Sequence, residues 1–136
     1  MRRIFVDSGG FFALLVPEDQ SHPRAVELFQ QAETDHWRLI TTNVVVIETY
    51  TLVLVRVRDG RRHAIGFLDR LERTPCRVER TRLTDETRAV ALVRAHRDKD
   101  YSLCDALSFV VMERLGIREA IAFDRHFRAY GRFTIL

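Results

Sequence analysis

The chain has 136 residues, 46% of them hydrophobic, which is enough for one domain with its own core, and its net charge is only +3. No apolar run reaches membrane-spanning length, and the two cysteines, Cys76 and Cys104, have neither disulfide-framework nor zinc-ligand spacing. These properties exclude a membrane span and a cysteine-based scaffold, and we expect a reduced, cytoplasmic protein forming one domain over residues 1–136.

The first half of the chain alternates short apolar runs with stretches of helical spacing. The sequence Asp7-Ser8-Gly9-Gly10 predicts a turn, Pro17 ends a helix, and Asn43 is placed to cap a long helix. In chain order, the predicted elements are a strand at Arg3–Val6, a helix at Phe11–Val16, a helix from His22 through Ala32, a strand at Arg38–Thr41 and a helix from Asn43 to Asp59-Gly60.

The second half continues the alternation, with Ser102 as a predicted cap and Gly116 as a predicted helix end. Its predicted elements are a helix at Arg61–Arg73, a strand at Arg77–Val78, a helix at Thr84–His96, a helix from Ser102 to Gly116, a strand at Glu119–Phe123 and a strand at Arg132–Leu136. The whole pattern predicts an α/β fold with a central, mostly parallel sheet of four to five strands flanked by helices.

Four acidic residues occupy related places in this alternation. Asp7 and Asp124 each end an apolar run, Glu48 lies one turn inside a helix, and Asp105 is the third residue of another helix. The carboxyl ends of parallel strands and the starts of the following helices share one edge of a sheet, where α/β proteins bind ligands. We therefore expect all four side chains to face one cleft.

Carboxylates gathered in this way repel one another unless a cation compensates them. Oxygen ligands without His or Cys favour Mg²⁺ or Mn²⁺, and such ions bind phosphate and activate water. The pattern therefore predicts a metal site for phosphodiester cleavage, with Asp7, Glu48, Asp105 and Asp124 as its catalytic and metal-binding residues.

Each acid also has a structural interpretation. Asp105 completes a capping box at its helix start, and Glu48 has the position of a solvated helix residue. Asp7 is also a turn former, and Asp124 is placed for a surface ion pair with Arg125. The placement of all four at one edge favours the metal site, while the individual alternatives stay open.

The motifs around these acids resemble those of PIN-domain ribonucleases, most closely the VapC-type toxins of bacterial toxin–antitoxin systems. The resemblance runs almost end to end and rests on Ile4–Ser8, Thr41–Tyr50, Asp100–Phe109 and Ala122–Phe127. It implies an endoribonuclease that uses Mg²⁺ or Mn²⁺ to cleave RNA, a homodimer, and a small antitoxin protein that blocks the cleft.

The same resemblance implies roles for residues beside the acids. It makes Asp7 and Asp105 the firmest metal ligands, and Ser8 and Asn43 either polar supports of the ligands or helix caps. Cys104 stands where relatives often carry a hydroxyl group. From its place in the sequence alone, Asp100 either joins the cluster or stays solvated.

Arginine clusters are the candidate RNA-binding surface, since guanidinium groups pair with phosphates in two-point geometry. One cluster contains Arg58, Arg61 and Arg62 together with Arg56, and the other contains Arg77, Arg80 and Arg82; a genome rich in arginine codons is the competing explanation. The apolar residues Leu52, Leu54 and Phe67 are either partner contacts or, by the stronger expectation, core residues.

Two other α/β classes begin with a strand-ending Asp but lack their remaining residues here. A haloacid-dehalogenase-like phosphatase needs a second acid two residues later, where this chain has Gly9. A response-regulator receiver needs adjacent acids and a late lysine, whereas the one lysine, Lys99, lies in a predicted loop. The alternative that stays open is a PIN-like module that binds RNA or protein without catalysis.

Overall fold

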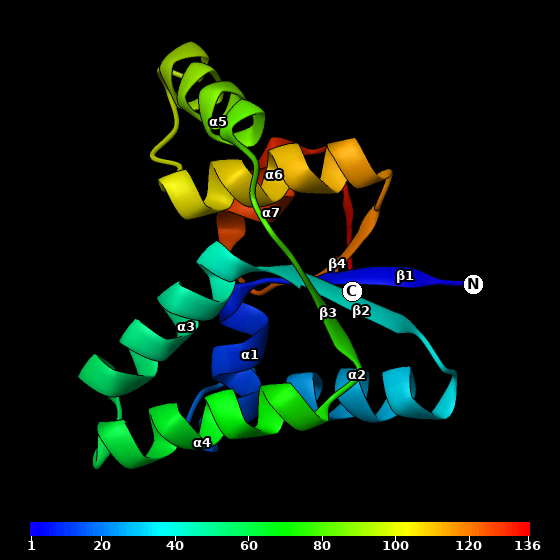
Figure 1. Ribbon diagram of the computed structural model, residues 1–136, viewed down its shortest axis with the longest axis vertical. Coiled ribbons are helices and arrows are strands. Elements are labelled where there is room, and N and C mark those ends of the chain that lie inside the picture. The colour runs from blue at the N-terminus through cyan, green and yellow to red at the C-terminus, as the bar shows by residue number, and fades with distance from the viewer.

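Five parallel strands form the centre of the computed structural model, which describes residues 1–136 (Figure 1). The strand order is β3-β2-β1-β4-β5. The strands are β1 (Arg3–Val6), β2 (Arg38–Thr42), β3 (Cys76–Glu79), β4 (Glu119–Ile121) and β5 (Thr134–Ile135). The predicted sheet is thus confirmed, and every strand pair in it is parallel.

Helices cover both faces of the sheet, which explains why the central strand is apolar at consecutive residues. Ile4, Phe5 and Val6 of β1 are fully buried. The helices are α1 (Ser8–Leu15), α2 (His22–Thr34), α3 (Asn43–Arg56), α4 (Gly60–Arg73), α5 (Leu83–Ala95), α6 (Leu103–Leu115) and α7 (Arg125–Tyr130). No helix has the combined length and apolar character needed to cross a membrane.

The two helical layers pack on the sheet through aromatic residues. On one face, Phe11 of α1 contacts Phe67 of α4 with ring centroids 5.3 Å apart. On the other face, Phe109 of α6 and Phe127 of α7 meet edge to face at 4.8 Å. Figure 1 shows α1, α2 and α4 below the sheet and α6 and α7 above it, with α5 packed outside α6.

A buried ion-pair network holds β3 and α5 against α6. The Arg114 guanidinium donates to Asp85 at 2.8 Å and to Glu79 at 3.0 Å. Asp85 is 1% exposed, so removing the arginine would leave a buried carboxylate without its partner. This network fixes the outer helix relative to the helix that carries Asp105.

The structure corrects three local predictions. Residues 125–130 form α7, which was not predicted because six residues are too few to show helical periodicity. Thr42, not Asn43, caps α3 and accepts a hydrogen bond from the backbone N–H of Val45. Gly9 and Gly10 belong to α1 rather than to a turn.

Gly10 has a steric role that explains why a glycine stands inside this helix. A Cβ atom at Gly10 would lie 2.7 Å from the carbonyl oxygen of Ile121, so the glycine allows α1 to approach β4 closely. At the neighbouring Gly9, the nearest atom to an added Cβ would be 3.7 Å away, which is ordinary contact.

We expect Gly10→Ala to lower the free energy of unfolding by about 1–3 kcal/mol, because α1 would have to move away from β4. Gly9→Ala is the matched control, and it should leave stability unchanged or slightly raised because alanine favours a helix. Urea denaturation of both variants measures the difference. Equal stability of the two variants would contradict the close approach of α1 and β4.

Candidate active site

Asp7 is the residue that links β1 to α1, and its side chain is 2% exposed. It has the N-cap position of α1 but makes no side-chain capping bond, and its Oδ1 atom has no hydrogen-bond partner. Burial, together with the negative charges of Asp105 and Glu48, raises the pKa of Asp7 to about 8. Asp7 is therefore a buried carboxyl with unused ligand capacity beside two other acids.

Asp105 is held by the predicted capping box at the start of α6. The Ser102 hydroxyl accepts from the backbone N–H of Asp105 at 3.0 Å, and Oδ2 of Asp105 accepts from the backbone N–H of Ser102 at 3.1 Å. The side chain is 5% exposed. Burial and the nearby carboxylate of Asp124 both raise the pKa of Asp105. The structural interpretation is thus correct, and the same box orients the carboxylate toward the other acids.

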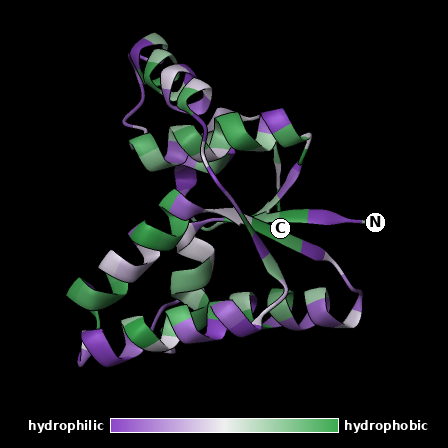
Figure 2. Cartoon of the chain, in the orientation of Figure 1, coloured by the Kyte–Doolittle hydropathy of each residue, from purple (hydrophilic) through white to green (hydrophobic).

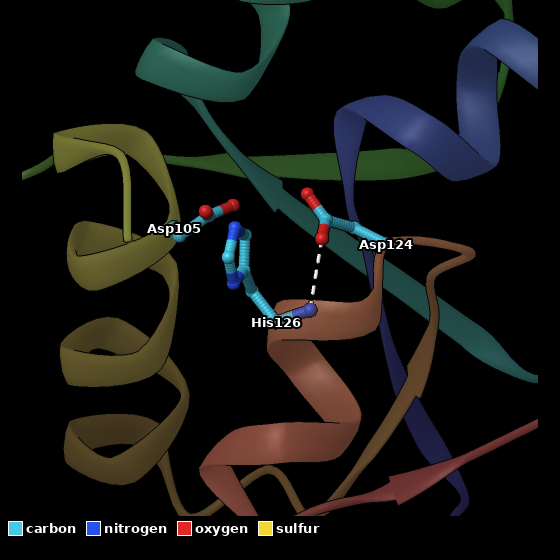
Figure 3. Close-up of side chains that lie close together, drawn as sticks. All are labelled: Asp105, Asp124 and His126. Carbon is cyan, nitrogen blue, oxygen red and sulfur yellow. Dashed lines mark hydrogen bonds between the residues drawn. The ribbon is translucent and has the colours of Figure 1, made fainter. Parts of the chain in front are cut away.

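Asp124 follows β4 and caps α7 (Figure 3). Its Oδ1 atom accepts from the backbone N–H of His126 at 2.8 Å, so Asp124 serves as a helix cap rather than as the ion-pair partner of Arg125. The ligand atoms of Asp105, Asp124 and His126 all lie within 4.8 Å of one another. His126 was missed by the sequence reasoning, because its place in the first turn of α7 depends on a helix that was not predicted.

Glu48 lies in the second turn of α3, and its position is set by a contact with α1. Oε1 of Glu48 accepts from the Ser8 hydroxyl at 2.5 Å. Because Ser8 follows Asp7 directly, this bond brings the Glu48 carboxylate to the side of the cluster formed by β1 and α1. All four predicted acids therefore lie at the carboxyl edge of the sheet, but only Asp105 and Asp124, with His126, have ligand atoms that all lie within 4.8 Å of one another.

Cys104 lies inside this cluster. Its side chain is buried, and its pKa is raised first by burial and then by the charges of Glu48, Asp7 and Asp105. The thiol is therefore a neutral group among the acids.

The other predicted residues have different surroundings. Asn43 accepts from the backbone N–H of Thr81 at 2.9 Å, and so holds the segment after β3 against the start of α3. Asp100 is exposed in the loop before α6. Arg58, Arg61 and Arg62 lie around the turn between α3 and α4. This turn follows the C-terminal end of α3, and the helix rises by roughly 12 Å between Glu48 and that end.

Comparison with known proteins identifies the family of this chain. The PIN domain family matches residues 4–132. The chain is 35% identical over 128 residues to the 23S rRNA-specific endonuclease VapC20 of Mycobacterium tuberculosis, covering 94% of each protein. The crystal structure of that VapC20, described as a sarcin–ricin loop cleaving toxin, has a TM-score of 0.86 at 34% identity over 95% of both chains.

Two further solved structures share the fold at much lower identity. One is VapBC2 of Rickettsia felis bound to a promoter DNA fragment, with a TM-score of 0.68, 9% identity, and coverage of 98% and 97% of the two chains. The other is FitAcB of Neisseria gonorrhoeae, with a TM-score of 0.66, 13% identity, and coverage of 98% and 96%. Together, the family match, the identity to VapC20 and the shared fold show that this chain belongs to the PIN-domain family, among its VapC-type members.

Proposed function

We propose that this chain is a metal-dependent endoribonuclease that cleaves ribosomal RNA and acts as the toxin of a toxin–antitoxin pair. The observation that carries the proposal is the meeting of Asp7, Glu48, Asp105 and Asp124 at the ligand-binding edge of a PIN fold. The 35% identity to an endonuclease supports it over a non-catalytic binding module, for which a cluster of like charges would be only a cost to stability.

The four carboxylates suit a divalent cation because no lysine or arginine pairs with them. Although the chain has 22 lysine and arginine residues, none of its eight ion pairs includes any of the four acids. The buried, unpartnered Oδ1 atom of Asp7 provides a free ligand position. We infer that the four acids hold Mg²⁺ or Mn²⁺, which when bound supplies positive charge and an activated water beside the phosphodiester.

The chain's own hydrogen bonds would keep these ligands in place. The capping box holds one oxygen of Asp105, and the Ser8 hydroxyl holds one oxygen of Glu48. Asp7 is fixed through its backbone, since its N–H donates to the carbonyl oxygen of Ile121 in β4 at 3.1 Å. We infer that this rigid frame allows cation and phosphate to bind with little rearrangement.

We propose 23S rRNA as the substrate and its sarcin–ricin loop as the cleavage site. This step rests on VapC20, which is described as specific for that RNA and as cleaving that loop. A ribosomal substrate also accounts for the cytoplasmic location that we propose.

Two groups of arginines are candidates for contacts with the RNA backbone. Arg80 and Arg82 are exposed in the segment after β3, which Asn43 ties to the start of α3 and hence to the carboxyl edge of the sheet. Arg58, Arg61 and Arg62 lie at the far end of α3, where they would contact RNA outside the cleft. We infer that the first group guides the scissile strand and the second binds flanking RNA.

This chain has a surface that suits the proposed antitoxin, away from the carboxyl edge of the sheet. An apolar cavity of about 880 Å³ lies between α2 and α4, with Phe29, Trp37 and Leu71 among its lining residues. Arg38, Arg70 and Arg77 also line it, which would favour an acidic amphipathic helix as the bound segment. Phe67 contributes its ring to the wall of this cavity as a core residue, 3% exposed.

A homodimer is supported by the exposed apolar side chains of α3. Ile47 is 64% exposed, Leu54 41% and Val55 74%, and Figure 2 shows hydrophobic colouring over much of this helix. Such a face on a long helix is typical of a protein–protein contact. We propose that a second copy of the chain covers it.

The catalytic assignment is tested by Asp7→Asn and Asp105→Asn, which keep side-chain volume but remove a ligand charge. Each variant should cut a 23S rRNA fragment at least about a hundredfold more slowly. Residues that act as one unit depend on one another, so the loss of one removes most of their joint effect. Asp69→Asn, on the exposed face of α4, is the control and should cut at the parental rate. If both active-site variants cut as fast as the parent, the assignment is wrong.

The cation assignment is tested by the pH dependence of stability in the presence of a chelator. Because the pKa of Asp7 is raised from 3.8 to about 8 in the folded state, the folded protein keeps a proton that the unfolded chain releases. Stability of the metal-free parent should therefore fall between about pH 4 and pH 8. Asp7→Asn should lack this loss, and its advantage over the parent should reach a few kcal/mol near pH 8.

Added Mg²⁺ or Mn²⁺ should raise the melting temperature of the parent near pH 8 and leave Asp7→Asn almost unchanged, because the cation binds only the folded, ionised site. Asp69→Asn should follow the parent in both conditions. A parent whose melting temperature is insensitive to millimolar metal would favour a non-enzymatic PIN module.

The RNA surface is tested by replacing two arginines at a time with glutamine. Replacing both Arg80 and Arg82 with glutamine should weaken RNA binding. The slope of the logarithm of affinity against the logarithm of salt concentration should become shallower by roughly 0.7–0.9 for each lost phosphate contact. Arg61→Gln with Arg62→Gln tests the distal group and should have the smaller effect on cleavage of a short hairpin. Filter binding at several salt concentrations provides both measurements, and an unchanged slope in both variants would exclude both surfaces.

A further inference from the structure

His126 is the nitrogen-bearing side chain of the acid cluster. Its ring nitrogen and the carboxylate oxygens of Asp105 and Asp124 lie within 4.8 Å of one another, and Figure 3 shows the ring beside both carboxylates. Opposed ligands of a small divalent ion are roughly 4 Å apart, so only small side-chain movements separate this arrangement from a coordinated one.

One contact holds the backbone of His126 and another restrains its ring. The backbone N–H of His126 donates to Asp124, which places the residue in the first turn of α7. The ring also packs edge to face against Tyr101, with centroids 5.4 Å apart and an interplanar angle of 85°. A residue held at its backbone and restrained at its ring is preorganised toward the neighbouring carboxylates.

A second observation points to a missing group at the same edge of the sheet. Oδ1 of Asp7 is buried and has no hydrogen-bond partner. A Cβ atom at Gly9 would lie 3.8 Å from the other Asp7 oxygen and 4.0 Å from the backbone nitrogen of Asp124, so the Asp7 carboxylate lies close to the start of α7. An unpaired buried oxygen is costly unless an unseen group satisfies it.

We propose that His126 is a direct nitrogen ligand of the cation bound by Asp105 and Asp124, and that it makes this site prefer Mn²⁺ and related transition-metal ions over Mg²⁺. The inference rests on the proposed function, since it concerns the same cation. Mg²⁺ takes oxygen ligands almost exclusively, whereas imidazole nitrogen suits first-row transition metals. Replacing an oxygen ligand by His126 therefore changes which cation is bound best.

Nitrogen coordination is tested on the parent protein with Mn²⁺ bound, by pulsed electron paramagnetic resonance. We expect a coupling from a directly bound ¹⁴N nucleus, replaced by a ¹⁵N coupling when the protein is made with ¹⁵N-histidine. Because this measurement uses the unaltered chain, it does not depend on how well a variant folds.

Selectivity is tested by titrating Mn²⁺ directly and Mg²⁺ by competition. His126→Ala should lower Mn²⁺ affinity at least about tenfold while leaving Mg²⁺ affinity within about twofold, and His126→Gln, which keeps an oxygen or amide at that position, should behave similarly toward Mn²⁺. His63→Ala, on exposed α4, is the matched control and should bind both ions as the parent does.

The outcomes separate this inference from the function on which it rests. Mn²⁺ binding without a nitrogen coupling, or equal loss of both ions in His126→Ala, would overturn the role of His126 and leave the carboxylate site intact. Failure of the parent to bind either ion would overturn the proposed metal-dependent function and this inference together.

Discussion

Mutual repulsion of carboxylates at the edge of a buried sheet is the constraint on which this structure depends. Asp7 is almost fully buried, two neighbouring acids increase the cost of ionising it, and no lysine or arginine forms an ion pair with any of the four acids. A chain with this many arginines has ample means to neutralise such a group. The separation of lysine and arginine side chains from the cluster is the reason why we propose a cation for that role.

The fold supports this arrangement with bonds that also build its secondary structure. The box between Ser102 and Asp105 starts α6, and the Asp124 carboxylate starts α7. The Ser8 hydroxyl, in the first turn of α1, joins that helix to Glu48 of α3. Helix starts therefore coincide with positions of the acid cluster, because the free N–H groups of a helix start hold a carboxylate in a fixed orientation. Structural and chemical interpretations of these acids are not exclusive.

The acid cluster, the apolar cavity and the exposed apolar residues of α3 lie on different parts of the molecule. The carboxyl ends of the strands carry the acids, while the cavity between α2 and α4 is apolar and lined in part by arginines. The exposed apolar side chains of α3 form a third surface, which begins near the site and continues away from it. Catalysis and two kinds of protein contact can thus occupy different faces of one small domain.

The sequence alone determined the alternation of elements, the parallel sheet and the residues of the acid cluster, because buried strands, helix starts and strand-ending acids leave local patterns. Only the tertiary structure decided what depends on distant contacts. Asn43 binds the segment after β3 instead of capping its own helix, and Gly10 is explained by an oxygen of β4. The short α7 is stabilised by packing and by its cap rather than by periodicity, so the position of His126 beside the acids could not be read from its neighbours in the chain.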